Sequence, residues 1–380
     1  MTQDRREFLK TFGMAAGAAL ASQLAGCQQT RLSSESASNR PSHLVRFGNT
    51  DLWVSRLCQG TAFRTHLSRE GGDGRAHELI RHCIDIGINF FDSAEGYGSG
   101  GSEIALGRGI AGRRDQVIIA TKASASNASG EPIAFTKEIL MSKAEGSLKR
   151  LGTDYIDLYL LHNPDERTPS KDDDDPPPDT PTRAHMEEIA ESMGSLVRSG
   201  KIRYWGVSNH LPRQIDELIE MGWRPGTAPI AGLEDSYCIA AADPDWFGWK
   251  YTTRDFMMDD LFPVMRKGNL GLMAYGPLGG GSLVPGREPK EGSPLSELIA
   301  VIDEVANELS VSRPQVCVAW VASYPEVTSV LTGAEKPEHV EDNLRGTQLA
   351  LPSEVRQRLD TASSAYVGRV RKMLAGSGTG

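Results

Sequence analysis

INFFDSAEGYG, residues 88–98, is the stretch of sequence from which the fold can be worked out. A short apolar run ends at Asp92, and a polar loop that contains glycine and Tyr97 follows it. Runs that are apolar at successive positions and too short for an ordinary helix are typical of strands buried on both faces of a parallel sheet. The stretch therefore predicts a buried strand that carries a carboxylate, and then a phenol, to one end of a sheet.

Two later stretches repeat this pattern. VIIATK (117–122) ends an apolar run at Lys122, and YIDLYLLH (155–162) ends another at His162. In a parallel α/β barrel every strand delivers its carboxyl end to the same rim, so residues that are distant in sequence converge there. We therefore expect one barrel mouth to hold all four polar side chains.

Strand-like runs alternate with amphipathic stretches along the chain, which predicts βαβ units and a parallel sheet. The predicted strands are LCQGT (57–61), NFFD (89–92), VIIAT (117–121), YIDLYLL (155–161), YWGVSN (204–209), GLEDSYC (232–238), LGLMAY (270–275) and VTSVLT (327–332). The predicted helices lie at 75–87, 136–152, 183–200, 212–222 and 294–310. Eight such strands close a single (β/α)8 TIM barrel.

Residues 43–57 precede the barrel and alternate around the turn-forming Gly48-Asn49-Thr50-Asp51. This pattern predicts an N-terminal β-hairpin that plugs the bottom of the barrel. The barrel domain is expected to span residues 44–370, with a disordered tail at 371–380.

Two insertions follow predicted strands. Residues 166–181 contain an acidic run and a proline run, so we expect a mobile loop on the catalytic face. Residues 243–251 contain Trp246 and Trp249 among four aromatic side chains. That segment is expected either to pack as a lid or to line the substrate pocket, where both tryptophans are candidate substrate contacts.

The first 27 residues predict an export signal. Arg5-Arg6-Glu-Phe-Leu-Lys10 precedes a run of Ala, Gly, Leu and Met that is too short to span a bilayer comfortably, as in a twin-arginine (Tat) signal. The run ends in Leu24-Ala25-Gly26-Cys27, which is similar to a bacterial lipoprotein lipobox. We expect cleavage before Cys27, lipidation of its thiol, and a position on the periplasmic or outer face of a membrane. An ordinary amphipathic helix is the alternative interpretation.

Residues 28–43 are rich in serine and poor in aliphatic side chains, which predicts a flexible tether. The formal net charge of −9 provides no basic surface for nucleic acid, so a small-molecule substrate is the better expectation. Cys58, Cys83, Cys238 and Cys317 form no CxxC and no metal-ligand spacing. They are expected to be core residues, with neither disulfides nor a metal.

The four rim residues together suit the reduction of a carbonyl group. A free phenol with a pKa of about 10 donates its proton poorly at neutral pH, so Tyr97 needs a cationic neighbour to act as a general acid. Lys122 would supply that charge, Asp92 would orient Lys122, and His162 would hydrogen-bond the carbonyl oxygen. Because no side chain donates hydride, the reaction needs a borrowed cofactor, for which nicotinamide is the obvious candidate.

Each of these residues also has an ordinary structural interpretation. Asp92 could cap the next turn, Tyr97 could be a packed loop aromatic, Lys122 a solvated strand end and His162 a satisfied rim histidine. The functional interpretation is favoured because stability does not explain why four strand ends deliver a carboxylate, a phenol, an ammonium and an imidazole to one rim.

Several longer motifs resemble the aldo-keto reductase family over residues 44–343. They are FFDSAEGYGSGGSEIALGRGI, VIIATK, SLKRLGTDYIDLYLLHNPD, GKIRYWGVSNH, LMAYGPLGGG and LTGAEKPEHVEDNL. The resemblance implies a catalytic tetrad of Asp92, Tyr97, Lys122 and His162, with NAD(P)(H) bound across the barrel mouth. It also implies cofactor contacts from Ser208, Asn209, Tyr275, Gly276, Leu278, Gly280, Gly333, Lys336, His339, Asp342 and Asn343.

Two positions depart from the family pattern. Glu335 stands where many NADPH-dependent members carry a basic or small residue, and its carboxylate would repel a 2′-phosphate unless Lys336 compensates. In the sixth strand the family has Gln a few residues before Tyr, where this chain offers Glu234 or Leu233. The cofactor is therefore expected to be NADP(H) or NAD(H), with NADP(H) slightly favoured.

We predict an oxidoreductase that transfers hydride between nicotinamide and an aldehyde, ketone or alcohol, with a sugar as one candidate substrate. If the cofactor stays bound after export, such an enzyme would oxidise one substrate and reduce another. The alternative is a non-catalytic accessory or regulatory barrel of a membrane-associated assembly, because the family includes such subunits. The sequence does not indicate the oligomeric state.

Overall fold

The computed structural model describes residues 43–62, 75–127, 129–165, 182–241 and 254–377. Its centre is a closed barrel in which each strand pairs in parallel with the next along the chain, and the last strand pairs with the first. The barrel strands are β3 (Leu57–Gly60), β4 (Phe90–Asp92), β5 (Ile118–Ala123), β6 (Ile156–Leu161), β7 (Ile202–Ser208), β8 (Gly232–Ser236), β9 (Gly271–Tyr275) and β10 (Ser329–Thr332). The predicted TIM barrel is confirmed, including its sixth strand.

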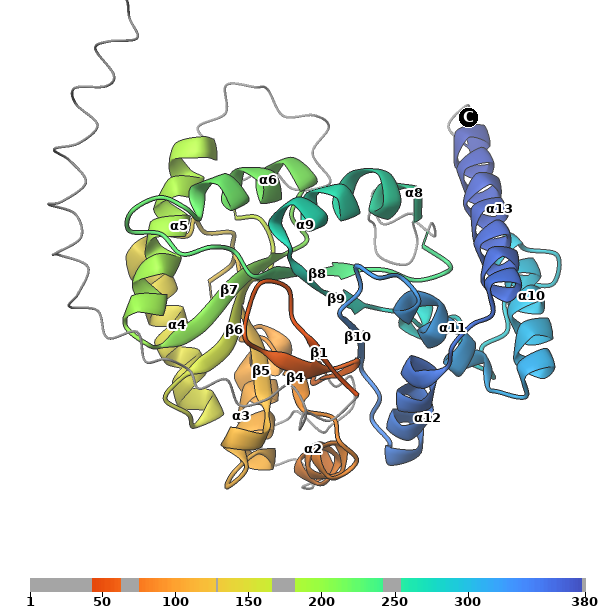
Figure 1. Cartoon of the computed structure of the whole chain (residues 1–380), viewed down its shortest axis with the longest axis horizontal. Coiled ribbons are helices and arrows are strands. Elements are labelled where there is room, and N and C mark those ends of the chain that lie inside the picture. The colour runs from red at the N-terminus through yellow and green to blue at the C-terminus, as the bar shows by residue number, and fades with distance from the viewer. Residues whose placement is uncertain (1–42, 63–74, 128, 166–181, 242–253, 378–380) are drawn as a thin grey trace, which may run out of the picture. The chain divides into compact units, whose positions relative to one another are not determined.

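Helices surround the barrel (Figure 1). They are α2 (Arg75–Asp85), α3 (Gly101–Gly109), α4 (Lys137–Leu151), α5 (Thr182–Arg198), α6 (Pro212–Met221), α8 (Arg254–Phe256), α9 (Phe262–Gly268), α10 (Pro294–Leu309), α11 (Arg313–Ala322), α12 (Pro337–Gln348) and α13 (Ser353–Ser377). Shorter turns are η3 (Tyr97–Gly100), η4 (Arg114–Gln116), η5 (Met257–Leu261) and η6 (Gly279–Gly281). The predicted helices near 75, 136, 183, 212 and 294 correspond to α2, α4, α5, α6 and α10.

Local sequence explains where α4 begins and ends. The Thr136 side chain accepts a hydrogen bond from the backbone N–H of Ile139 and caps the first turn. Gly152 ends the helix at a φ of 65°, a left-handed conformation that glycine adopts without a steric cost.

Alternate residues of each strand face the inside and the outside of the barrel. Phe90 packs in the inner core, whereas Phe91 packs in the outer core beneath the helices. In the same way Leu158 and Leu160 point inward while Tyr159 points outward. Because both faces are buried, the strands are apolar without alternation. The next inward position of each strand lies at the mouth.

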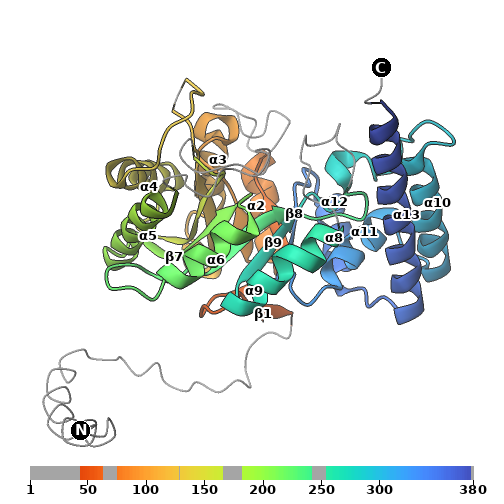
Figure 2. The same ribbon diagram turned by 90° about the horizontal axis from the view of Figure 1, so that it is seen from above.

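An antiparallel hairpin of β1 (Leu44–Arg46) and β2 (Trp53–Ser55) closes one end of the barrel, as predicted (Figures 1 and 2). Phe47 of its turn is fully buried against Phe90, with ring centroids 5.8 Å apart. The ring fills the space left by Gly232 and Gly271, where any Cβ would lie within 2.7 Å of it. Both glycines begin strands, so the hairpin seals the end opposite the predicted site.

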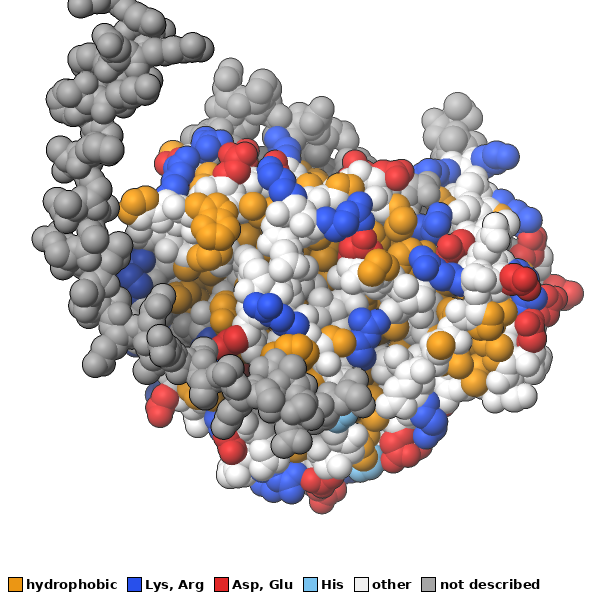
Figure 3. All heavy atoms as spheres, in the orientation of Figure 1, with side chains coloured by type: hydrophobic (Ala, Val, Ile, Leu, Met, Phe, Trp, Pro, Cys, Tyr) orange, Lys and Arg blue, Asp and Glu red, His pale blue; other side chains and the backbone are white. Residues whose placement is uncertain are grey.

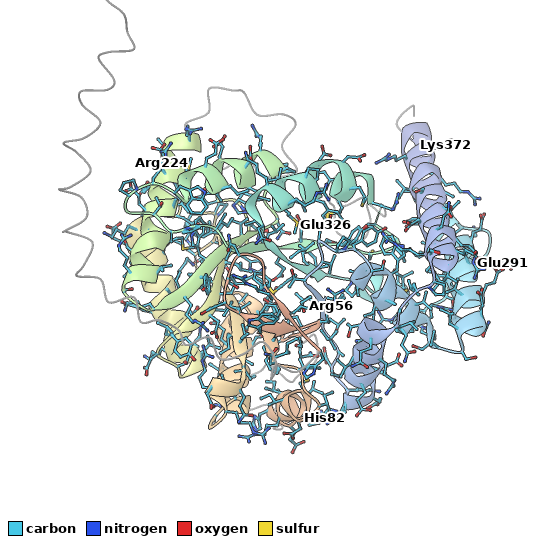
Figure 4. All side chains as sticks on the ribbon, viewed as in Figure 1. Arg56, His82, Arg224, Glu291, Glu326 and Lys372 are labelled. Atoms are coloured by element: carbon cyan, nitrogen blue, oxygen red, sulfur yellow. The ribbon has the colours of Figure 1, made fainter. Side chains whose placement is uncertain are left out.

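Arg56 joins the hairpin to the last barrel strand (Figure 4). Its Nη1 donates a hydrogen bond of 2.8 Å to the carbonyl oxygen of Val327, which lies just before β10. Burial lowers the pKa of this guanidinium.

Six helices have no counterpart among the five predicted ones, namely α3, α8, α9, α11, α12 and α13. The pattern does not predict α3, whose sequence is rich in glycine, or α11, whose side chains are almost all buried and therefore show no amphipathic period. The predicted disordered tail at 371–380 is wrong for its first part, because α13 continues to Ser377. Tyr366 and Val367 anchor this helix in the outer core.

The cysteines Cys58, Cys83, Cys238 and Cys317 are buried free thiols, as predicted. No helix within the described ranges combines the length and apolar character needed to cross a bilayer. Cys27, the tether and the insertions with Trp246 and Trp249 lie outside the described residues. Acidic and basic side chains are interspersed on the face shown in Figure 3.

Candidate active site

The inward alternation of the strands carries polar side chains to the barrel mouth. Asp92 lies two residues beyond the inward-facing Phe90, and Lys122 lies two residues beyond Ala120. Lys122 is inside β5, which extends to Ala123, rather than after the strand as the sequence suggested. His162 directly follows β6, two residues beyond Leu160. The predicted convergence of these strand ends is therefore present in the structure.

Lys122 is the centre of the site, although its side chain is fully buried. Its ammonium donates hydrogen bonds to Asp92 Oδ1 at 2.5 Å, to the carbonyl oxygen of Ser93 at 3.0 Å and to the Tyr97 hydroxyl at 3.3 Å. An ammonium has three N–H donors, so these three acceptors use its whole hydrogen-bonding capacity.

The phenol and the imidazole lie side by side at this centre. The Tyr97 and His162 ring centroids are 5.4 Å apart in an edge-to-face arrangement, and Lys122 Nζ lies 4.8 Å from the Tyr97 ring centre. Tyr97 begins the short turn η3 and is half-buried. The structure thus brings together all four residues of the predicted tetrad.

Glu95 holds the loop that carries Tyr97. Its Oε1 accepts a hydrogen bond of 2.7 Å from the backbone N–H of Ser124, and the Lys143 ammonium of α4 lies 2.5 Å from the same oxygen. The backbone N–H of Glu95 donates to the carbonyl oxygen of Lys122 at 3.3 Å. The backbone and the side chain of Glu95 therefore fix the loop to the end of β5, and its side chain also fixes the loop to α4. Sequence reasoning missed this role.

Burial is the main influence on the titration of the site. It raises the pKa of the Tyr97 hydroxyl above its ordinary value, and the Lys122 ammonium opposes this increase while the Asp92 and Glu234 carboxylates add to it. Burial alone would lower the pKa of Lys122, but the same two carboxylates raise it well above its ordinary value. At neutral pH, Tyr97 therefore keeps its proton and Lys122 keeps its charge.

His162 is held in its neutral form. Burial and the positive charge of Lys122 together lower the pKa of its imidazole to about 3. The ring is therefore uncharged at neutral pH, and it can donate a hydrogen bond to an oxygen at the mouth without supplying a charge.

Glu234 is a further acidic residue at this centre. It lies on β8, has 2 % of its surface exposed, and its Oε2 is 3.3 Å from Lys122 Nζ. Leu233, the other candidate for this position, packs in the outer core, so the alternation of β8 selects Glu234. Every residue of β8 is buried, so the sequence shows no alternation that marks which of the two positions faces inward.

Ser208 takes the inward position at the end of β7, and Asn209 directly follows this strand. Ser208 Oγ is buried and accepts or donates no hydrogen bond among the residues that the structure describes. Asn209 adopts a φ of 64° and donates to the carbonyl oxygen of His162 at 2.9 Å, while Tyr275 at the end of β9 donates to Asn209 Oδ1 at 3.1 Å. These contacts link three strand ends around an unpaired hydroxyl.

The glycine-rich segment after β9 contains Gly276, Leu278 and Gly280 of the predicted cofactor contacts. Four of its glycines have positive φ values, which range from 50° at Gly280 to 100° at Gly281. Successive backbone N–H groups in such left-handed conformations form concave sites that suit anions. The segment thus fits the phosphates of a dinucleotide.

The second phosphate segment lies at the start of α12. Gly333, Lys336 and His339 are exposed, and Lys336 is the residue before the first helical turn. Glu335 is half-buried next to it. Asn343 is buried, whereas Asp342 receives hydrogen bonds from Ser312 Oγ and Gln315 Nε2 at 2.5 and 2.7 Å. Its carboxylate is therefore already hydrogen-bonded to the two side chains of the capping box, Ser312 and Gln315, at the start of α11.

The residues fit the nicotinamide nucleotide that the sequence predicts. The Ser208 hydroxyl, unpaired among the described residues, offers a polar partner deep in the mouth, and the glycines of the segment after β9 let its backbone approach a phosphate closely. Across the described part of the chain, no three His, Cys, Asp or Glu side chains are arranged as metal ligands.

Known proteins and structures that align with most of this chain agree with the fold and the site described above. The model of the Aldo/keto reductase family matches residues 56–364. A methylglyoxal reductase of Escherichia coli (strain K12) is 29 % identical, over 76 % of this chain and 85 % of its own length. A probable voltage-gated potassium channel subunit beta of Oryza sativa is 28 % identical, over 78 % and 89 %. The crystal structure of a thermostable aldo-keto reductase superimposes with a TM-score of 0.65 at 27 % identity, covering 84 % of this chain and 99 % of that one.

Proposed function

The chain belongs to the aldo/keto reductase family and is an NAD(P)(H)-dependent oxidoreductase that acts on carbonyl groups, and we propose that Tyr97 is the general acid and base of its reaction. The observation that carries this proposal is the Tyr97 hydroxyl 3.3 Å from an ammonium that Asp92 holds at 2.5 Å. A phenol next to a buried ammonium that is charged at neutral pH can release its proton when a carbonyl oxygen gains negative charge.

In the direction of reduction, reduced nicotinamide supplies the hydride when it is bound. Tyr97 donates its proton to the carbonyl oxygen, and Lys122 stabilises the negative charge that remains on the phenolate. Asp92 keeps Lys122 charged and directed at Tyr97. The neutral imidazole of His162 hydrogen-bonds the same carbonyl oxygen and orients the substrate.

Turnover and cofactor content test this function. The purified protein is expected to oxidise NADPH when a small aldehyde such as methylglyoxal is added, with one alcohol formed for each NADPH consumed. Native mass spectrometry of protein purified from its membrane fraction identifies any dinucleotide that remains bound. If neither NADPH nor NADH is consumed with any of a panel of aldehydes, ketones and sugars, the proposed activity is wrong.

NADP(H) is the proposed cofactor, because the Lys336 ammonium lies before the first turn of α12, where a helix start favours phosphate. Glu335 acts against a 2′-phosphate, so the preference over NAD(H) is expected to be small. The aromatic segment at 243–251 supports a sugar as the proposed substrate, because aromatic rings stack on the apolar faces of sugars.

Export and lipidation are proposed from Arg5-Arg6 and Leu24–Cys27. Cys27→Ala should move the protein from the membrane fraction to the soluble fraction, since the acylated thiol would be lost. Metabolic labelling with a fatty acid should mark the wild type and not the variant, and Cys58→Ala serves as the control because that thiol is buried in the barrel. Equal labelling of wild type and Cys27→Ala would contradict the proposal.

A second candidate function is a cofactor-binding accessory subunit of a membrane assembly. The likeness to a probable potassium channel subunit beta favours it, as does Glu234 at the position where the family has Gln. The two functions differ in what they require of Tyr97, because binding alone does not need its hydroxyl.

A further inference from the structure

The site holds two buried carboxyl groups but only one ammonium to balance their charge. Asp92 and Glu234 are each 2 % exposed and both face the single ammonium of Lys122, which is fully buried. A second ionised carboxylate would leave this buried centre with a net negative charge, which is unfavourable in a medium of low polarity.

The hydrogen bonds show which carboxyl oxygen at this centre lacks a donor. Lys122 directs its three N–H groups at Asp92, Ser93 and Tyr97. Glu234 Oε2 is near enough to the ammonium for an ion pair, yet no donor in the described part of the chain reaches it with hydrogen-bond geometry. An ionised carboxylate needs such donors, whereas a protonated carboxyl group can itself donate.

We propose that Glu234 is a protonated carboxylic acid in the working enzyme and shares its proton with Asp92. We also propose that its ionisation sets the pH above which kcat/KM falls, an inference that rests on the proposed function. Glu234 is a positioning residue, because it acts on Tyr97 through Asp92 and Lys122. Its proton keeps the centre of Asp92, Lys122 and Glu234 neutral before Tyr97 gives up its own proton.

The titratable groups that surround Glu234 come from four strands of the barrel and one loop. They are Cys58 of β3, Asp92 of β4, Tyr97 of the following loop, Lys122 of β5 and Tyr275 of β9. Burial, and then the charge of Asp92, raise the pKa of Glu234 well above its ordinary value, and Lys122 opposes the increase. The direction agrees with the hydrogen-bond geometry.

Loss of this proton would oppose the reaction. When Tyr97 protonates a carbonyl oxygen, negative charge accumulates on its phenolate, and an ionised Glu234 would place a further negative charge in the same buried centre. The phenolate would then be less stable and the proton transfer slower. A glutamine at this position has nearly the same shape but cannot ionise.

The first test is the pH profile of Glu234→Gln. Wild-type kcat/KM should fall at alkaline pH as Glu234 ionises, by at least tenfold below its plateau. In the variant, kcat/KM should stay constant to higher pH, until another group of the site ionises. Glu304→Gln, which removes a carboxylate from the exposed side of α10, should follow the wild-type profile. Profiles of the wild type and Glu234→Gln that coincide would overturn the proposal.

The second test does not depend on turnover. Infrared spectroscopy of the wild type at pH 7 should show a protonated-carboxyl C=O band that shifts with ¹³C-glutamate and disappears in Glu234→Gln. The melting temperature of the wild type should also fall relative to Glu234→Gln as the pH rises above the ordinary carboxyl pKa, by about 2 °C per pH unit. The sign follows because the unfolded chain releases this proton at lower pH than the folded protein does.

The two tests separate the two proposals. If the infrared band is present but no carbonyl compound is reduced, the proton is where we place it and the proposed function is wrong. If carbonyl compounds are reduced but the band is absent and the pH profiles coincide, the function stands and the role of Glu234 is wrong.

Discussion

Tyr97→Phe should lower kcat/KM for carbonyl reduction by roughly 10²–10⁴-fold, the usual contribution of a positioned general acid. The substitution removes only the hydroxyl that Lys122 contacts at 3.3 Å and leaves the ring packed against His162. Binding of NADPH, measured by fluorescence titration, should therefore change little. The measurement is steady-state reduction of an aldehyde across the pH range.

Tyr204→Phe is a matched control for this experiment. Its hydroxyl donates a hydrogen bond to Asp51 of the N-terminal hairpin, at the sealed end of the barrel. Loss of that hydroxyl should leave turnover unchanged. If Tyr97→Phe retained wild-type turnover, another group would have to donate the proton. A wild type without turnover would instead support the accessory-subunit function.

Lys122→Met should abolish reduction and also destabilise the protein at neutral pH. Methionine fills a similar volume, but it leaves Asp92 and Glu234 buried against each other without a cation. Breaking a buried ion pair in this way typically costs about 3–5 kcal/mol. Chemical unfolding at pH 5 and at pH 8 measures the loss.

The loss of stability should depend on pH with a definite sign. Burial already raises the pKa of both carboxyl groups in the wild type, and without the ammonium nothing opposes that increase. The folded variant then binds more protons than the unfolded chain, so the deficit grows as the pH rises above the ordinary carboxyl range and shrinks toward pH 4. Lys201→Met, which breaks an exposed pair with Glu145, should cost about 0–1 kcal/mol with little dependence on pH. Equal deficits for Lys122→Met at pH 5 and pH 8 would contradict this account.

Much of the barrel follows from local sequence because its strands are buried on both faces. Runs such as IDLYLL in β6 are apolar at almost every position, so they can be recognised without knowing their partners. The same burial hides α11 from a sequence reading, because a helix that is buried on all sides has no amphipathic period. The short, glycine-rich α3 gives too weak a pattern, and α13 is stabilised by contacts of Tyr366 and Val367 with distant parts of the chain.

The sequence by itself determined the eight strands, the hairpin plug and the four rim residues, because in a parallel barrel the end of each strand has only one rim to reach. Only the tertiary structure decided how those side chains meet. The phase of β8 selects Glu234 over Leu233, and the closure of the barrel brings that carboxyl group within 3.3 Å of a lysine 112 positions earlier in the chain, which is already paired with Asp92. Such a charge balance arises from distances across the barrel and from burial, and neither quantity is written in the local pattern of residues.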